Sequence, residues 1–129
     1  MFDLDVFISY THRDNRSEWI SKLHQELEIR LSELLGRAVT VWRDSKLRGT
    51  DIALNETTQQ LRNAAVMVVV VTPSWIRSVW CQKELSAFLD ATAQQGGIMI
   101  GTELRVVKVV KTPIEEDRER TILPTTLWI

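Results

Sequence analysis

The segment AVMVVVVT at residues 65–72 limits the fold of this chain more than any other part of its sequence. Polar and apolar residues do not alternate within it, which is typical of a strand buried on both faces, as the central strand of a parallel sheet is. Pro73 ends the segment. The full apolar run, at 64–71, is far too short to span a bilayer as a helix. We therefore expect a central strand with helices on both sides.

Three further segments have the apolar, β-branched composition of strands. They are DVFISY at 5–10, AVTVW at 38–42 and RVVKVVKT at 105–112. Helical patterns separate the strands, because an apolar stripe begins at Trp19 and a weaker helix is predicted at 52–63. Strands that alternate with helices favour a parallel sheet, since the crossover between parallel strands needs a connection of helix length.

The ends of the helices also have recognisable signals. Asn15 and Glu18 have the spacing of a capping box before the first helix, and Gly36 is placed to stop it. Ser74 or Ser78 can cap the helix that follows Pro73. That helix is predicted to close at the glycine pair 96–97.

The expected fold class is α/β, a flavodoxin-like doubly wound parallel sheet with helices on both faces. The tail runs from a charged segment at 114–120 to a weakly apolar one at 121–129, and it stops where a fifth strand would be expected. We therefore expect the fifth strand to be truncated. The length of 129 residues suits one domain, which we expect to be the N-terminal part of a longer multidomain protein.

Composition excludes several classes of function. Sixteen Lys and Arg against seventeen Asp and Glu give a net charge of -1, so nucleic acid and anionic membranes are not expected as partners. Cys81 is the only cysteine, which excludes an internal disulfide and a cysteine metal cluster and favours a reducing, cytoplasmic location. His12 and His24 lack metal-ligand spacing and are expected to be ordinary surface residues.

Ligands of open α/β sheets bind beyond the carboxyl ends of the strands, where the strand order reverses. The loop after the first strand has no closely spaced glycines, so neither a P-loop nor a G-x-G-x-x-G dinucleotide site is expected. A magnesium-binding receiver site is also disfavoured, because the third strand ends in Thr72 rather than in an acid. The polar candidates at this edge of the sheet are Ser9, Tyr10, Thr11, His12, Arg13, Arg43, Asp44, Thr72, Trp80 and Glu84.

Three segments in order resemble the motif regions of the Toll/interleukin-1 receptor (TIR) domain. They are DVFISYTHRD, VWRDSKLRGTDI and VVVVTPSWIRSVWCQKEL, and together they extend over most of the chain. The resemblance implies the TIR fold. Arg48 stands where animal receptor domains usually carry a proline, so this loop is more similar to that of bacterial and plant members.

The resemblance also implies an activity. Many bacterial, plant and axonal TIR domains cleave NAD⁺ between nicotinamide and ribose, with a catalytic glutamate four residues after a tryptophan, as Glu84 follows Trp80. The implied catalytic residue is Glu84, NAD⁺ is a substrate rather than a cofactor, and no metal is required. The implied substrate-binding residues are Trp80, Tyr10, Ser9, Thr11, Arg43 and Asp44.

The implied partners are other TIR domains, which associate through the loop at about 44–52. Its expected self-association residues are Leu47, Arg48, Gly49 and Asp51. For a bacterial member the resemblance implies defence against phage. Two alternatives stay open: the chain is a non-catalytic interaction module, or Trp80 is simply a core residue and Glu84 a solvated helix residue.

Overall fold

A computed structural model describes residues 4–43, 51–97, 99–100, 103–113 and 127–128 of the chain. Its main sheet has the strand order β2-β1-β3-β6-β7, and every pair of neighbours is parallel. The strands are β1 (Leu4–Ser9), β2 (Val41–Arg43), β3 (Ala64–Val71), β6 (Val106–Val110) and β7 (Leu127–Trp128). This is the order of the flavodoxin-like sheet, so the predicted fold class is confirmed.

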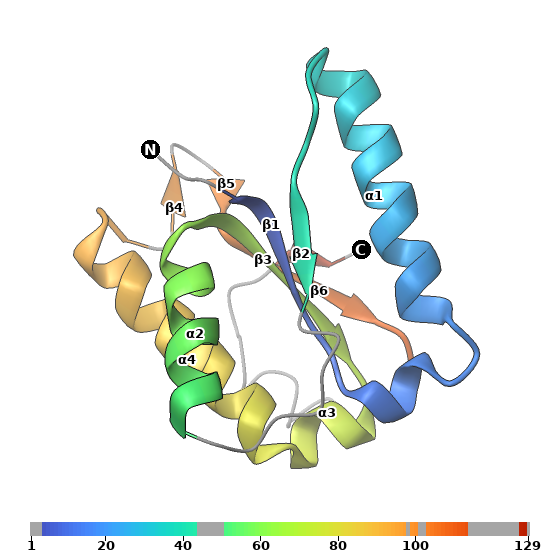
Figure 1. Cartoon of the computed structure of the whole chain (residues 1–129), viewed down its shortest axis with the longest axis vertical. Helices are drawn as coiled ribbons and strands as arrows, with labels where there is room; N and C mark the ends of the chain where they lie inside the picture. The colour runs from blue at the N-terminus through green and yellow to red at the C-terminus, as the bar shows by residue number, and fades with distance from the viewer. Residues whose placement is uncertain (1–3, 44–50, 98, 101–102, 114–126, 129) are drawn as a thin grey trace.

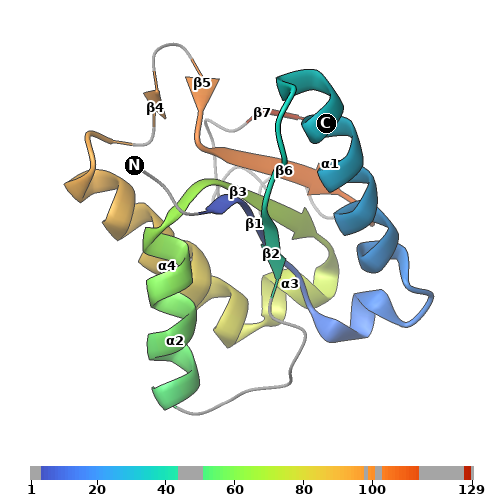
Figure 2. The same cartoon turned by 45° about the horizontal axis from the view of Figure 1, so that its top comes forward.

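Helices cover both faces of the sheet (Figures 1 and 2). Helix α1 (Trp19–Leu35) lies on one face, whereas α2 (Asp51–Arg62), α3 (Pro73–Arg77) and α4 (Val79–Gln94) lie on the other. Strand β3 lies at the centre and its last five residues are all buried. The apolar run at 65–72 is therefore the central strand, as its composition predicts.

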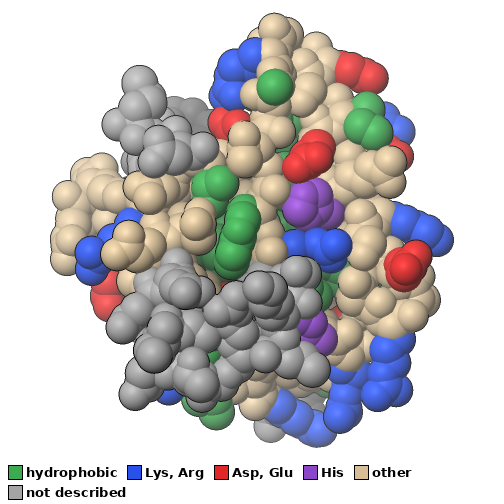
Figure 3. Space-filling view, viewed as in Figure 1, with side chains coloured by type: hydrophobic (Ala, Val, Ile, Leu, Met, Phe, Trp, Pro, Cys, Tyr) green, Lys and Arg blue, Asp and Glu red, His purple; other side chains and the backbone are tan. Residues whose placement is uncertain are grey.

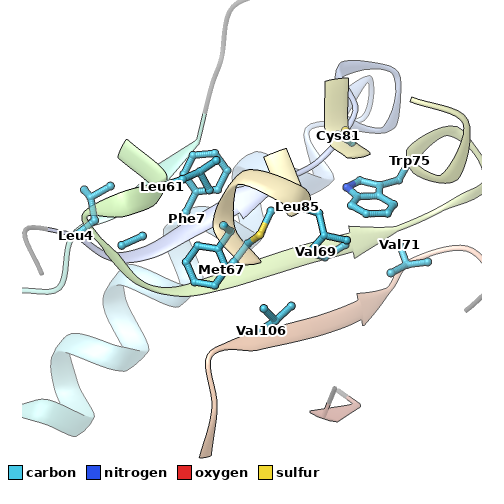
Figure 4. Packing of buried hydrophobic residues seen from close by; sticks show 12 residues of the cluster. Leu4, Phe7, Leu61, Met67, Val69, Val71, Trp75, Cys81, Leu85 and Val106 are labelled. Carbon is cyan, nitrogen blue, oxygen red and sulfur yellow. The ribbon is translucent and has the colours of Figure 1, made fainter. Parts of the chain in front are cut away.

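Each face of the sheet has its own apolar core. The core under α1 contains Ile20 together with Val68 and Val70 of β3. The core under α2, α3 and α4 is larger, and Figure 4 shows part of it. Its buried members are Leu4, Phe7, Leu61, Ala64, Met67, Val69, Val71, Trp75, Cys81, Leu85, Phe88 and Val106.

The start of α1 differs from the predicted capping box. The residue before the helix is Glu18, at φ 60°, and its side chain makes no capping bond. Asn15 ends a short 3-10 helix, η1 (His12–Asn15), and its Oδ1 accepts from the backbone N–H groups of Ile20 (2.8 Å) and Ser21 (3.1 Å). The capping-box prediction is wrong because α1 begins four residues beyond Asn15, which caps the helix from outside.

The segment after β3 forms two helices instead of one. Thr72 caps α3 by accepting from the backbone N–H of Trp75 at 3.1 Å, and Pro73 occupies the first turn, where a missing N–H costs nothing. Ser78 caps α4 by accepting from the backbone N–H of Cys81 at 3.2 Å. Of the two predicted caps, Ser78 is confirmed, whereas Ser74 lies inside α3.

Two features lie toward the end of the chain. Strands β4 (Met99–Ile100) and β5 (Glu103–Leu104) form an antiparallel pair that the sequence did not indicate, because two residues are too short to show a period. The fifth position of the main sheet is occupied by β7, which is two residues long and pairs with β6. None of the helices in the described ranges has both the length and the hydropathy needed to cross a membrane.

Candidate functional site

Ser9 and Glu84 are 75 residues apart in the sequence and meet at the carboxyl edge of the sheet. Ser9 is the last residue of β1, and Glu84 lies in the second turn of α4. The Ser9 hydroxyl donates to Oε1 of Glu84 at 3.1 Å, and the indole Nε1 of Trp75 donates to the Ser9 hydroxyl at 3.0 Å. Ser9 and Trp75 are fully buried, and Glu84 is 3% exposed.

The donors in this chain of hydrogen bonds fix the direction of the Ser9 proton. An indole N–H can only donate, so the Ser9 oxygen must accept from Trp75. The single hydroxyl proton of Ser9 is then left for Oε1 of Glu84, which accepts it. Oε1 of Glu84 is therefore an acceptor in this network, and the neutral hydroxyl of Ser9 is one of the groups that hold it.

A second network joins the loop after β1 to the end of β3. Thr11 donates to Oδ2 of Asp14 at 2.6 Å, and Thr72 donates to the same oxygen. Thr72 also accepts from the backbone of Trp75, the residue whose indole holds Ser9. The Asp14 carboxylate thus connects η1 to the corner that carries the donor for the Ser9–Glu84 pair.

Cys81 lies one turn before Glu84 and is closed to solvent. Its thiol donates to the backbone oxygen of Tyr10 at 3.5 Å. Burial, with the negative charge of Glu84 as the next cause, raises the pKa of Cys81 to about 12. The nucleophilic form of cysteine is the thiolate, so Cys81 serves as a small buried residue and not as a nucleophile.

The other candidates from the sequence divide between the two faces of the sheet. Ser9 faces α4, whereas Tyr10 belongs to the core under α1. The Tyr10 ring lies 5.2 Å from that of His12 and 5.8 Å from the guanidinium of Arg43, which also donates to Ser21 at 3.3 Å. The structure thus brings Ser9 to Glu84 and Tyr10 to Arg43, but these two pairs lie on opposite faces of the sheet.

Trp80 is half-buried, one turn before Glu84 on α4. Glu84 itself is buried, so the alternative of a solvated helix residue is wrong. Asp51 opens α2, but its side chain is not described. The remaining candidates lie outside the described residues: Asp44, Leu47, Arg48 and Gly49.

Both histidines are partly exposed, as the sequence predicts, and Figure 3 shows histidine side chains at the surface. His12 is half-buried against Tyr10, and His24 contacts Oε1 of Glu28 at 3.1 Å through Nε2 while its Nδ1 is buried without a hydrogen-bond partner. Among the side chains that the structure describes, no three His, Cys, Asp or Glu are grouped as metal ligands would be.

Exposed cations border the site. Arg13 and Arg16 follow β1, and Arg77 ends α3. Figure 3 shows lysine and arginine side chains along the lower right edge of the molecule, where η1 and α3 lie in Figure 1. This edge is therefore positively charged although the whole chain is not.

Sequence reasoning missed two groups that belong to this site, the buried Trp75 and the half-buried Asp14. Neither is among the candidates from the sequence, although Trp75 donates to Ser9 and Asp14 accepts from Thr72. The signal for Trp75 was its indole N–H, because a buried tryptophan next to the end of a strand usually needs an acceptor. Asp14 had no such signal, since its partner Thr72 is 58 residues away.

Comparisons with known proteins identify the family. The family model described as TIR domain matches residues 6–120. One similar solved structure is that of the activated Roq1 resistosome directly recognizing the pathogen effector XopQ (TIR domains). It is 27% identical to this chain and has a TM-score of 0.58. The match covers 83% of this chain but only 57% of the other one. The TIR domain of the Toll-related receptor TRR-2 from Hydra magnipapillata shares the fold, at 18% identity and a TM-score of 0.59 over 97% of this chain and 83% of that one. A search of curated proteins gave no match. The chain therefore belongs to the TIR domain family.

Proposed function

We propose that this TIR domain is an NAD⁺ nucleosidase that cleaves the bond between nicotinamide and ribose. The observation that carries the proposal is the Glu84 carboxylate, held by Ser9 at the edge of the sheet where ligands of such folds bind. Trp80, one turn earlier on α4, is the proposed aromatic wall for the nicotinamide ribose. The exposed cations of the loop after β1 suit the pyrophosphate of a dinucleotide.

The chemistry asks little of the protein beyond one placed negative charge. The carbon–nitrogen bond breaks heterolytically, and its electron pair stays on nicotinamide, which enters the reaction as a cation and departs neutral. No general acid is needed for this leaving group. The ribose becomes an oxocarbenium-like cation that Glu84 stabilises electrostatically. Water captures that cation and loses a proton to give ADP-ribose, or the adenine ring captures it to give a cyclic product.

Access to Glu84 has to change before a ribose can contact it. With 3% of its surface exposed, the carboxylate of the isolated chain is closed to a ligand. We therefore propose that the nucleosidase is activated by association with other TIR domains, through the loop that contains Leu47, Arg48, Gly49 and Asp51. The activated assembly named in the Roq1 structure supports this part of the proposal. The proposed setting is the cytoplasm of a bacterium, in defence against phage.

The test is release of free nicotinamide from NAD⁺, measured with dispersed protein and with protein clustered on a multivalent scaffold. We expect release from the clustered protein and little from the dispersed form. Glu84→Gln keeps the size of the side chain and removes its charge, so release should fall at least about a hundredfold, in line with the loss of a main electrostatic group. Glu33→Gln, an exposed position on α1, is the matched control. Equal release by Glu84→Gln and the control would refute the assignment.

The burial of Glu84 also favours a second candidate, a non-catalytic module that only recruits other TIR domains. This candidate predicts association without turnover. Clustered protein would then leave NAD⁺ intact, and Arg48→Ala or Gly49→Ala would abolish binding between domains. Measurements of nicotinamide and of association on the same samples separate the two functions.

A further inference from the structure

Asp14 and Glu84 are two carboxylates that lie at opposite ends of one series of hydrogen bonds. Thr72 donates to Oδ2 of Asp14, and Ser9 donates to Oε1 of Glu84 at 3.1 Å. Trp75 lies between these two pairs, because its backbone N–H donates to Thr72 at 3.1 Å and its indole Nε1 donates to Ser9 at 3.0 Å. The series therefore runs from a half-buried acid of η1 to the buried acid of α4.

Both hydroxyls in the series are used in the same way. The two N–H groups of Trp75 can only donate, so the oxygens of Thr72 and Ser9 accept from them. The single proton of each hydroxyl is then left for a carboxylate. A hydroxyl whose proton is held by a carboxylate is polarised and becomes a better acceptor, so the bonds on either side of Trp75 strengthen one another.

Asp14 acts on Trp75 through the cap of α3. This helix has only five residues, and so short a helix is not stable on its own. The backbone N–H of Trp75 bonds to the capping hydroxyl of Thr72, and Asp14 sets the direction of that hydroxyl. Trp75 is fully buried, and Figure 4 shows its indole among the side chains of the core under α4. The position of the indole beside Ser9 therefore depends on how α3 begins.

The bond from Thr72 is separate from the local bond that Asp14 accepts in its own turn. Thr11 donates to the same Oδ2 at 2.6 Å, but it is only three residues away and does not belong to the series. Thr72 is 58 residues away, at the corner between β3 and α3. A role confined to η1 would need only the bond from Thr11, so Thr11 provides a control for the bond from Thr72.

The charge of Asp14 also acts on α4. Burial is the main cause that raises the pKa of the Cys81 thiol to about 12, and the negative charges of Glu84 and Asp14 contribute to it. Cys81 lies one turn before Glu84. Asp14 can therefore affect the start of α4 by its charge as well as by its hydrogen bonds, and an experiment has to separate the two effects.

We propose that Asp14 is a positioning residue for Glu84. Its Oδ2 fixes the Thr72 hydroxyl and, through it, the backbone of Trp75. The indole of Trp75 in turn fixes the Ser9 hydroxyl that donates to Glu84. The series is a property of the folded chain, and only its effect on turnover rests on the proposed nucleosidase. The first two tests therefore do not involve NAD⁺.

The first test follows the indole N–H of Trp75 by NMR in variants of η1. Asp14→Ala removes the acceptor of Thr72, and the loss of a hydrogen bond to a charged group should raise the hydrogen exchange rate of this indole about tenfold or more. Asp14→Asn keeps an oxygen that accepts from Thr72 and should restore most of the protection. Thr11→Val, the matched control, disturbs the same turn but keeps the bond from Thr72, so the rate should change by less than about twofold. Equal exchange rates in Asp14→Ala and Thr11→Val would overturn the role of Asp14.

The second test follows the carboxyl carbon of Glu84 by NMR. Asp14→Asn measures the effect of the lost charge alone, whereas Asp14→Ala also removes the bond from Thr72. The additional shift in Asp14→Ala should disappear when Ser9→Ala is already present, because the series is then interrupted before Glu84. An additional shift of the same size with and without Ser9→Ala would mean that Asp14 does not act through Ser9, which contradicts the proposal.

A measurement on the unmodified protein covers the case in which Asp14→Ala does not fold. Nuclear Overhauser contacts are expected between the Cβ protons of Asp14 and Thr72, because their side-chain oxygens are hydrogen-bonded. The absence of these contacts would remove the first link of the series and, with it, the proposal.

Turnover is measured on the clustered protein. Asp14→Ala should lower kcat about tenfold and leave KM unchanged, because Asp14 acts on the substrate only through Glu84. Asp14→Asn should restore most of kcat, and Asp90→Ala, at an exposed position of α4, is the matched control. A changed Trp75 indole without nicotinamide release by any form of the protein keeps the positioning role and removes the nucleosidase. Equal release by Asp14→Ala and Asp90→Ala, with an unchanged indole, does the reverse.

Discussion

Ser9→Ala is the most direct perturbation of the site because it removes one oxygen atom and creates almost no cavity. The hydroxyl is fully buried, accepts from the indole of Trp75 and donates to Glu84. Without this hydroxyl, the buried indole N–H of Trp75 loses its acceptor and the buried Oε1 of Glu84 loses a donor. A buried polar group that loses its partner costs about 1–3 kcal/mol, and two such groups lose it here, so the variant should lose about 2–6 kcal/mol of unfolding free energy.

Urea unfolding measures this loss directly. With a urea slope of about 2 kcal/mol/M, we expect the midpoint to fall by about 1–3 M and the slope to stay unchanged. Ser17→Ala is the control, since Ser17 is exposed before α1 and its loss should change the stability by less than about 0.5 kcal/mol. If Ser9→Ala were as stable as Ser17→Ala, then the hydroxyl would not link Trp75 to Glu84, and the assignment of the Ser9 proton would be wrong.

Three further predictions concern other groups. Cys81 should resist a thiol reagent at pH 8 until the protein unfolds, because burial raises its pKa to about 12; rapid labelling of the native protein would contradict this. The hydrogen bond from Arg37 lowers the pKa of Asp5 in the folded protein below its ordinary value of 3.8. The stability that Asp5 contributes is therefore complete above pH 3.8 and is lost as the pH falls through the pKa of the folded state. Asp5→Asn should therefore flatten the acid side of a melting-temperature profile, and an unchanged profile would refute the effect. Arg105→Met should lose at least about 3 kcal/mol in urea unfolding, because three acceptors lose a charged donor, whereas the exposed Arg77→Met should lose little.

The sequence predicted the sheet well because its strands are short apolar runs separated by helix-length segments. The run at 65–72 is the central strand, and the helix from Trp19 ends before Gly36, whose φ of 66° suits glycine. The errors occurred where tertiary contacts decide the outcome. Asn15 caps α1 across a 3-10 turn, and β4 and β5 are too short to show any pattern.

The site was only partly predictable, for a physical reason that concerns adjacent residues. Ser9 and Tyr10 are neighbours in the sequence and were expected at one ligand site, but the alternation of a strand sends them to opposite faces of the sheet. The nearness of Ser9 to Glu84 depends on how α4 packs across β1, which no local pattern contains. The resemblance to TIR motifs supplied what local patterns lack.

The shared acceptor at Asp14 has a mechanical consequence. One carboxylate oxygen receives the hydroxyls of Thr11 and Thr72, so η1 cannot shift alone without breaking a charge-assisted hydrogen bond. It must move together with the corner that begins α3, and Trp75 travels with that corner. A partner that displaces η1 would thus also displace the indole of Trp75 in the interior, and with it the hydrogen bonds that hold Ser9 and Glu84.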